Sequence, residues 1–275
     1  MWEAAARLGG RWGRHSPAAD AARPHLQAPP KRRKKAPRAE YDAAVAAAAG
    51  IADSPVEDQA AWLWGAYRAA LKLSALEAAG LDARSLLPLP GAPGASLATR
   101  LQAADPALWR EAADGGGGGP VRVLVVSPSA NAALAAGRSL GPALPHHRLF
   151  ARHIKQAEHE AELRAAPRAA AAGTPARVAS LADAGALDLA RLALLVLDTA
   201  LDVKQRTLLT QPDTAAAACG LLARHVAGRV AAGECRVALF DSAGGGTAPT
   251  KREARSAWRG GGRGGGRGRG GGRGG

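Results

Sequence analysis

Asp198 ends an apolar run, residues 194–197, and its position makes it the first candidate in this chain for a chemical role. A buried parallel strand delivers a carboxylate in this way to the edge of an α/β sheet. Enzymes that hydrolyse nucleotides hold magnesium with an acid at such an edge. The residues around Asp198 therefore raise the question of whether this chain hydrolyses a nucleotide.

The other parts of a nucleotide-hydrolysing site are missing from the sequence. A phosphate loop needs a lysine after a glycine, and none of the seven lysines follows a glycine. The glycine run 115–119 precedes a predicted strand instead of following one, which favours a linker. Thr199 stands where a helicase-type ATPase has a glutamate, and threonine cannot take a proton from water. We therefore predict no catalytic residue and only a degenerate acidic motif at Asp198 and Thr199.

Cysteine count and hydropathy exclude several other classes of protein. Cys219 and Cys235 have no zinc-type spacing, and two cysteines are too few for a disulfide framework. No apolar run approaches the ~18 residues of a membrane helix. We expect no metal, no cofactor, no bound nucleotide and no membrane partner.

The charge of the chain is concentrated in its two ends. The net charge is +14. Residues 1–40 carry ten Lys or Arg against three acids, and residues 251–275 carry eight against one, whereas residues 41–250 balance to zero. Basic arms on a neutral body indicate a polyanionic partner, most simply nucleic acid.

Each basic arm has a distinct composition. The N-terminal arm contains a run of five cations that suits a nuclear import receptor or a nucleic-acid backbone: Lys31, Arg32, Arg33, Lys34 and Lys35. The C-terminal arm is a low-complexity Arg-Gly segment, in which arginines can meet phosphates and stack on bases. We predict that RNA is bound there by Arg259, Arg263, Arg267, Arg269 and Arg273.

Four regions follow from the patterning of the chain. We expect a disordered tail over 1–40, a helical segment packed on the core over 41–113, an α/β domain over 121–241, and a disordered tail over 242–275. Within 41–113, Ser54 is the expected N-cap of a helix that runs to Gly80, with Leu63, Tyr67, Leu71 and Leu76 on its apolar face. A further helix is expected near 97–113, and Trp62, Trp64 and Trp109 are expected to be packing residues.

Strands and helices alternate from residue 121 onward. Strand-like segments begin near 121, 147, 169, 189 and 235, and helical patterns separate them, one of them starting at Thr174 or Pro175 and ending at Gly185 and the last spanning about 212–231. This alternation predicts a parallel sheet covered by helices. The fold class is therefore α/β, built on a single parallel sheet without a phosphate loop.

The order of these segments resembles the first RecA-like domain of a DEAD-box RNA helicase. A strand with a Ser127-Pro128 turn, the turn "GTPAR" and the acidic strand ending at Asp198 follow one another. The resemblance implies RNA backbone contacts at Ser127 and Pro128, and at Thr174, Pro175 and Arg177. Ser242 and Ala243 match the helicase Ser-Ala-Thr motif, whose threonine is missing here.

A more specific resemblance is to the Cms-one family of helicase-derived proteins. The segments "LFARHIK", "GTPARV" and "LLVLDTALDVKQRTLLTQPD" are similar to that family's segments, as are Asp53 to Pro55 and Val237 to Phe240, so the likeness covers about 51–241. It implies a non-catalytic factor of small-ribosomal-subunit biogenesis in the nucleus and nucleolus, with pre-rRNA and pre-ribosomal assembly proteins as partners. The family's acidic N-terminal run is missing, and Thr199 replaces an aromatic residue.

Two other functions and one local question stay open at this level. The Arg-rich, acid-poor N-terminus also suits an organelle transit peptide, and hence an organelle RNA-binding protein. A divergent nucleotide-binding enzyme would use Asp198, Asp202 or Ser242. Arg152, His153 and Lys155 fit either an RNA or protein contact or a solvated loop.

Overall fold

A computed structural model describes residue 43 and residues 45–92, 94–114, 119–151, 154–202 and 204–243. The run Lys31 to Lys35 and the five arginines of the Arg-Gly segment lie outside these residues, as do Arg152 and His153. The nuclear-localisation prediction for the first run and the RNA-binding prediction for the five arginines are therefore carried forward as proposals.

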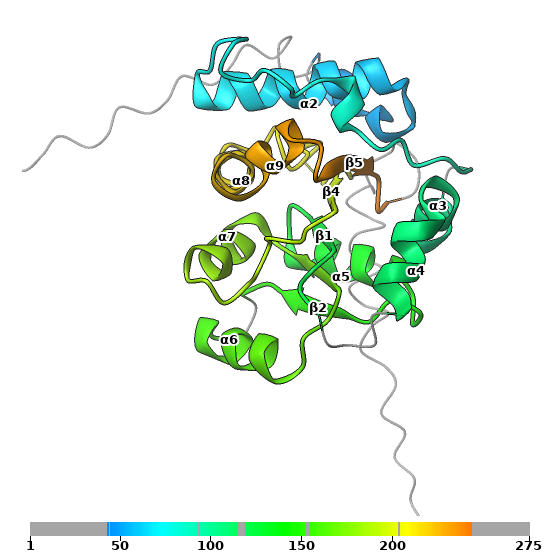
Figure 1. Ribbon diagram of the computed structural model, residues 1–275. Coiled ribbons are helices and arrows are strands. Elements are labelled where there is room, and N and C mark those ends of the chain that lie inside the picture. The colour runs from blue at the N-terminus through cyan, green and yellow to red at the C-terminus, as the bar shows by residue number, and fades with distance from the viewer. Residues whose placement is uncertain are drawn as a thin grey trace, which may run out of the picture. The chain divides into compact units, whose positions relative to one another are not determined.

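A parallel sheet of five strands forms the centre of the described chain, in the order β2-β3-β1-β4-β5 (Figure 1). The strands are β1 (Val123–Val126), β2 (His146–Leu149), β3 (Ala170–Gly173), β4 (Leu194–Asp198) and β5 (Arg236–Phe240). β1 pairs with β3 on one side and β4 on the other, all in parallel. All the residues of β1, β3 and β4 are buried, as expected for strands covered on both faces. The α/β fold with a parallel sheet predicted from the sequence is confirmed.

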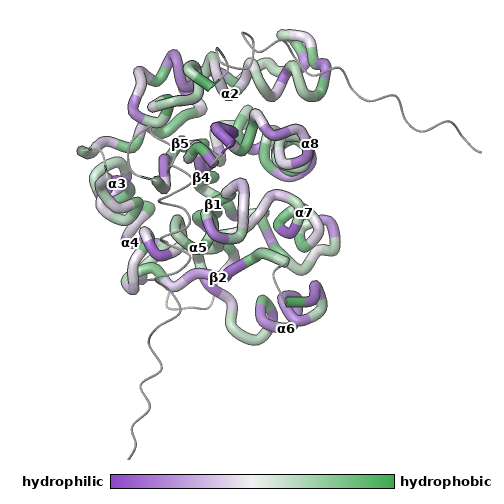
Figure 2. Tube along the Cα trace, turned by 180° about the vertical axis from the view of Figure 1, so that it is seen from behind, coloured by the Kyte–Doolittle hydropathy of each residue, from purple (hydrophilic) through white to green (hydrophobic). Residues whose placement is uncertain are grey.

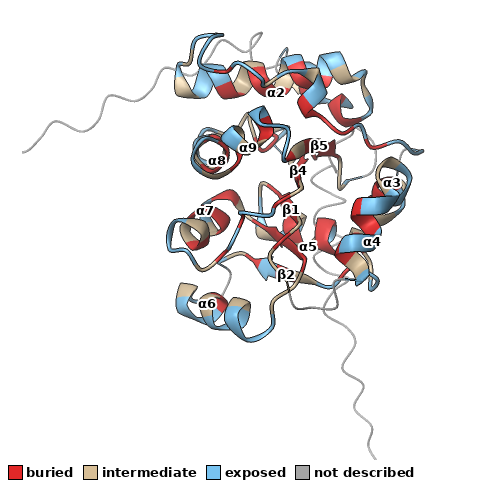
Figure 3. Cartoon of the chain, viewed as in Figure 1, coloured by how far each residue is buried: buried red, intermediate tan, exposed pale blue. Residues whose placement is uncertain are grey.

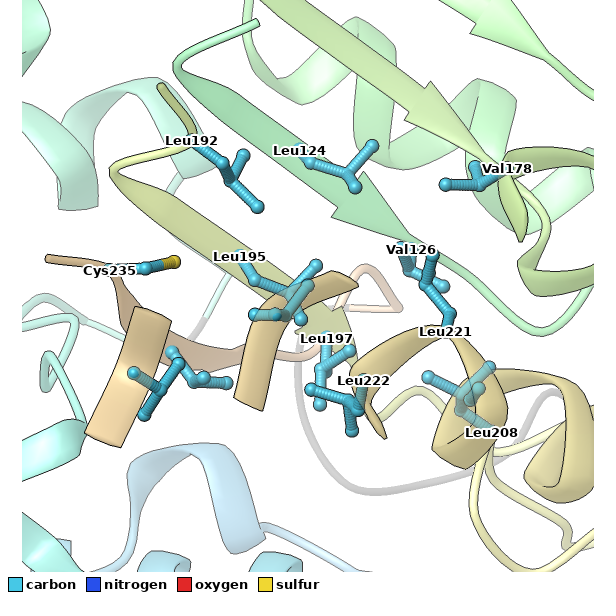
Figure 4. Close-up of a cluster of buried hydrophobic side chains, with 14 of the residues drawn as sticks. Leu124, Val126, Val178, Leu192, Leu195, Leu197, Leu208, Leu221, Leu222 and Cys235 are labelled. Carbon is cyan, nitrogen blue, oxygen red and sulfur yellow. The ribbon is translucent and has the colours of Figure 1, made fainter. Parts of the chain in front are cut away.

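Two hydrophobic clusters cover the two faces of the sheet. Figure 3 shows that the strands are mostly buried and that the helices around them are buried on part of their surface. Because side chains alternate along a strand, Leu124 and Leu195 face one cluster while Val125 and Val196 face the other. Figure 4 shows the first cluster, in which Leu221 and Leu222 lie over the strands. Its helices are α2 (Val56–Leu71), α7 (Pro175–Asp183), α8 (Pro212–Leu221) and α9 (Ala227–Ala231). The second cluster uses α3 (Leu97–Ala104), α4 (Pro106–Asp114) and α5 (Ala130–Ser139).

The segment before the sheet is joined to its last strand. The short 3-10 turns Ile51–Asp53 and Ala83–Ser85 flank α2 in sequence. The backbone N–H of Leu87 donates to the carbonyl of Val237 at 2.7 Å, which attaches the segment to β5. Trp64 is buried and donates its indole N–H to Ser85 Oγ at 3.1 Å. Trp64 and Trp109 are both core residues and Trp62 packs against the core, as the sequence predicts.

The boundaries predicted for α2 are wrong at both ends. Its N-cap is Pro55, whereas Ser54 stays outside and accepts a hydrogen bond from the Gln59 side chain through its carbonyl oxygen. The helix ends at Leu71, because Lys72 adopts a left-handed φ of 56° and Glu77 accepts hydrogen bonds from the backbone and hydroxyl of Ser74. Leu76 is consequently 85% exposed and does not share the apolar face.

Two other predicted helices are interrupted. The helix expected near 97–113 divides into α3 and α4 at Asp105, because Pro106 disfavours a helical conformation for the residue before it. The carboxylate of Asp105 then accepts a hydrogen bond from the Leu108 backbone in the first turn of α4. The helix expected over 212–231 contains a π-helical turn, Leu222–Val226, between α8 and α9. The helix predicted from Thr174 or Pro175 is confirmed as α7, with Thr174 as N-cap and Gly185 following it at φ 68°.

The remaining helix, α6 (Gln156–Ala165), is the most hydrophilic of the helices seen in Figure 2. It lies beside α7 at the β2 end of the sheet (Figure 1). His159 is its buried residue, and three glutamates occupy its other faces. The sequence prediction of a charged surface helix is confirmed.

Candidate functional site

Four of the residues singled out from the sequence follow strands that run in parallel. Ser127 comes after β1, Thr174 after β3 and Ser242 after β5, while Asp198 is the last residue of β4. The carboxyl ends of parallel strands meet at one edge of a sheet, where α/β proteins bind ligands. This edge, called here the carboxyl edge, is the candidate site.

Asp198 is completely buried and is bonded to residues of its own chain. Its exposed fraction is 0%. Oδ1 accepts hydrogen bonds from the backbone N–H of Ala200 at 3.1 Å and of Ser242 at 3.2 Å. Oδ2 accepts from the Ser242 hydroxyl at 2.8 Å. The carboxyl group therefore ties the end of β4 to the residues after β5.

The surroundings of Asp198 favour its neutral form. Burial raises the pKa of Asp198 above its usual range, although the donors from Ala200 and Ser242 act in the opposite direction. Ser127 also acts to lower this pKa, yet its buried hydroxyl has no partner within hydrogen-bond distance in the described residues. Ser127 therefore lies beside Asp198 without a formed hydrogen bond. A metal-holding carboxylate would need the opposite conditions, namely a charged and accessible group.

The neighbouring residues are also engaged within the chain. The backbone N–H of Thr199 donates to the carbonyl of Phe240 at 2.8 Å. Asp202 pairs with Arg206 at 2.6 Å, and although partial burial opposes it, this guanidinium lowers the pKa of Asp202. In the part of the chain that the structure describes, no three His, Cys, Asp or Glu side chains group as a metal site would. The carboxyl edge thus supports a structural role for Asp198.

The turn after β3 is fastened to the loop before α6. The Thr174 backbone donates to the carbonyl of Leu149 at 3.0 Å, and Pro175 is buried. Arg177 donates to the carbonyl of Ile154 at 3.2 Å and to His159 Nδ1 at 3.1 Å. Because a guanidinium can only donate, His159 Nδ1 accepts, and its Nε2–H donates to the carbonyl of Arg148 at 3.0 Å. Burial, followed by the charge of Arg177, lowers the pKa of His159 and keeps this ring neutral.

The sequence prediction brought Thr174, Pro175 and Arg177 together as an RNA contact, and the structure places them in one turn. Arg177 is half-buried and uses two nitrogens inside the chain. Lys155, from the third candidate group, is exposed at the N-cap of α6.

One polar cluster was missed from the sequence. Arg100 is 4% exposed and donates to Asp53 at 2.6 Å and to the carbonyls of Leu89 and Ala92. Asp53 was singled out only as part of a family segment. Arg100 itself could have indicated this cluster, because it lies on α3 between Leu97 and Leu101, which are both buried.

The comparisons with known proteins agree with the family resemblance. A family model described as "CMS1: U3-containing 90S pre-ribosomal complex subunit" matches residues 145–240. This range contains β2 to β5, the turn after β3 and Asp198. The resemblance to the Cms-one family is confirmed over these residues, which are similar to a family described as a subunit of a pre-ribosomal complex.

Two other comparisons add little. No curated protein matches the chain. Among solved structures, a DEAD box protein from the hyperthermophile Methanococcus jannaschii is similar at 15% identity, over 52% of this chain and 35% of that one, with a TM-score of 0.30. The match thus spans about a third of that protein's length.

Among the helices that the structure describes, none combines the length and apolarity needed to cross a bilayer.

Proposed function

We propose that this chain is a non-catalytic nucleolar factor of small-ribosomal-subunit biogenesis that takes part in pre-rRNA processing or assembly. The family match over residues 145–240 supports a role in ribosome biogenesis, because that family is described as a subunit of a pre-ribosomal complex. The partners in this proposal are pre-rRNA and pre-ribosomal assembly proteins. Its localisation is the nucleus and nucleolus.

The proposal that the chain is non-catalytic rests on the burial of Asp198. The oxygens of this carboxyl group face Ala200 and Ser242 of its own chain, and no part of it is exposed. Binding of magnesium there would require breaking these hydrogen bonds and charging a group whose pKa is raised by burial. An acid in this position stabilises the fold and leaves no carboxylate for a nucleotide-bound metal ion.

RNA binding is assigned to the two basic arms, with a smaller contribution from the turn after β3. The Arg-Gly segment supplies five arginines for phosphates and bases. The turn supplies Thr174, Pro175 and Arg177, and the hydrogen bonds of Arg177 to Ile154 and His159 hold its guanidinium in place. The run Lys31 to Lys35 is proposed as the nuclear-localisation signal. In this assignment the folded region over 41–241 positions the arms.

The test is affinity purification of the tagged full chain followed by measurement of the RNA that accompanies it. Enrichment of U3 RNA and sedimentation with 90S particles are expected. A variant with all five residues Lys31 to Lys35 changed to Ala is expected to lose nucleolar localisation and this enrichment. Recovery of organelle RNA, together with a mature N-terminus beginning after about residue 25, would replace the proposal by the transit-peptide alternative.

The enzyme alternative has a separate readout. Thermal stabilisation of the full chain by magnesium and ATP, lost in Asp198→Asn, would show a working nucleotide site. Unchanged melting with ATP or ADP is the expected result.

A further inference from the structure

The charge of the folded body is unevenly distributed along the chain. Residues 115–157 contain five Lys or Arg and no Asp or Glu, whereas the remaining residues of 41–250 carry 14 Lys or Arg against 19 acids. The acid-free stretch includes β1, α5 and β2. β1 is buried inside the sheet, and Figure 2 shows β2 as a hydrophilic strand. The excess positive charge of this stretch therefore belongs to the side of the body where α5 and the edge strand β2 lie.

Two cations of this stretch lie where α5 meets β2. A Cβ placed on Gly137 would lie only 2.4 Å from His146 Nε2, so α5 packs closely on the first residue of β2. Side chains alternate along a strand, which places Arg148 on the same face as His146. Arg138, which follows Gly137, is exposed like Arg148, and neither guanidinium has a carboxylate partner among the described residues.

The charged groups around His146 are all of one sign. Burial lowers the pKa of His146, and although the carbonyl of Leu144 opposes this, the charges of Arg148 and Arg168 lower the pKa further. Arg168 reaches this place because its guanidinium donates to the carbonyl of His146 at 2.8 Å. The imidazole is thus neutral and the arginines beside it supply a positive potential.

The outer edge of β2 is closed to a partner strand. The carbonyl of Leu149 accepts from the Thr174 backbone and faces β3, so the carbonyls of His146 and Arg148 face outward. The side chain of Arg168 covers the first, and His159 Nε2 donates to the second at 3.0 Å. Because side chains occupy this edge, a peptide cannot add to the sheet there by backbone pairing.

This surface continues to the turn after β3. Lys155 is exposed at the start of α6, and its carbonyl accepts from the His159 backbone at 3.4 Å. The carbonyl of the preceding residue, Ile154, accepts from Arg177 at 3.2 Å. Lys155 therefore lies between β2 and the turn already assigned to RNA. The surface formed by four cations is called here the β2 face: Arg138, Arg148, Arg168 and Lys155.

The composition of the β2 face favours a nucleic-acid backbone over a protein. Protein interfaces have aromatic or aliphatic anchors at their centre. Within the described part of the chain the exposed large hydrophobic residue is Leu76, which follows α2 and lies outside this face. Guanidinium and ammonium groups only donate, and phosphate oxygens are charged acceptors that match them.

We propose that the β2 face binds the phosphodiester backbone of RNA. This inference rests on the RNA binding proposed above and adds a surface of the folded body to the two arms. Phosphate contacts carry no base information, so binding at the β2 face has no sequence preference. RNA bound there passes from α5 along β2 toward Lys155 and the turn after β3.

Binding of an unstructured oligouridylate at increasing salt concentration tests this surface. The background is the full chain with its five Arg-Gly arginines changed to Ala, so that the C-terminal arm does not mask the body. In this background Arg138→Ala/Arg148→Ala should weaken binding several-fold. It should also lower the slope of log affinity against log salt by ~1.4, because each lost phosphate contact to a single strand lowers it by ~0.7.

The matched control removes the same charge on the side of β5. Arg68 lies in the last turn of α2 and Arg84 in the short turn after it, and both are exposed. Arg68→Ala/Arg84→Ala should keep the salt slope of the background. Circular dichroism and melting of both double variants should match the background, because all four side chains are exposed.

Equal affinity and equal salt slope in the two double variants would overturn the proposal. A loss of sedimentation with 90S particles in Arg138→Ala/Arg148→Ala, with unchanged oligouridylate binding, would also overturn it by assigning the β2 face to an acidic protein. The role in ribosome biogenesis is tested separately by enrichment of U3 RNA. A chain that binds oligouridylate through the β2 face without enriching U3 RNA would support this inference while the proposed function fails.

Discussion

Replacing Asp198 tests whether this residue has a structural role or a catalytic one. Asp198→Ala removes the acceptor of three hydrogen bonds, two from backbone N–H groups and one from the Ser242 hydroxyl. Asp198→Asn keeps the shape and keeps Oδ1 as acceptor for both N–H groups, while its amide can donate to Ser242 Oγ. Ser242→Ala removes the one hydroxyl contact.

The expected magnitudes follow from burial. A buried donor that loses its acceptor costs ~1–3 kcal/mol, and Asp198→Ala leaves two such backbone donors and a cavity. We expect it to lower the free energy of unfolding by about 3–5 kcal/mol, Ser242→Ala by about 1–2 kcal/mol, and Asp198→Asn by no more than ~1 kcal/mol. The prediction is that the loss in the free energy of unfolding is largest for Asp198→Ala, smaller for Ser242→Ala and smallest for Asp198→Asn.

The pH dependence has a defined sign. Burial raises the pKa of Asp198 in the folded chain above its unfolded value of ~4. The contribution of Asp198 to the free energy of unfolding is therefore fully present below pH ~4 and is lost as the pH rises through the pKa of Asp198 in the folded chain. Asn has no such loss, so the stability of Asp198→Asn relative to wild type should increase as the pH rises from about 4 to 7.

Urea unfolding of the full-length variants, followed by far-ultraviolet circular dichroism, measures these differences. A double-mutant cycle of Asp198→Ala with Ser242→Ala should show strong coupling, because the two residues share a hydrogen bond. An Asp198→Ala variant as stable as wild type, or an Asp198→Asn variant as destabilised as Asp198→Ala, would contradict the structural role of Asp198.

Four further outcomes are expected. Alanine at the five Arg-Gly arginines should weaken RNA binding and reduce the salt slope by up to ~3.5. Cys219 and Cys235, whose pKa values burial raises to about 11, should resist alkylation at pH 8 until the chain is unfolded. Gly173→Ala should abolish folding, because its Cβ would collide with the Leu149 carbonyl. Arg100→Ala should cost about 1–3 kcal/mol, since the carbonyls of Leu89 and Ala92 lose their donor while Asp53, whose side chain is 39% exposed, can be solvated.

Each of these outcomes has a contrary result. An unchanged salt slope would remove the Arg-Gly segment from RNA binding. Rapid alkylation of the native chain would show that the thiols are reachable. A folded Gly173→Ala, seen by its circular dichroism and melting, would mean that β2 and β3 can separate at this point. An Arg100→Ala variant as stable as wild type would show that its contacts to Asp53 and two carbonyls contribute no net stability.

Most of the sheet could be predicted from the sequence because its strands other than β2 are short, mainly apolar runs between glycine, proline and cap residues. β1, β3 and β4 are buried on both faces, so their residues are continuously apolar and easily recognised. α7 was predicted with both ends because Pro175 and Gly185 have conformational preferences that act locally. The position of Asp198 at the carboxyl edge followed from these elements.

Some errors arose from local turns that the apolar periodicity does not show, and others from contacts between distant parts of the chain. The periodicity after Leu71 continues far enough to suggest a longer helix, but Lys72 turns left-handed and the turn at Ser74 and Glu77 replaces it. Sequence patterns do not show hydrogen-bond partners that are 40 or more residues apart. The bond between Asp198 and Ser242 and the pair of Arg100 with Asp53 are of this kind.

The most direct test of the central claim is calorimetric titration of the full chain with ATP in the presence of magnesium. A buried Asp198 held by Ala200 and Ser242 predicts no binding tighter than about millimolar. Submillimolar binding that Asp198→Asn abolishes would contradict the claim, because it would show that this carboxyl group holds a nucleotide-bound metal ion after all.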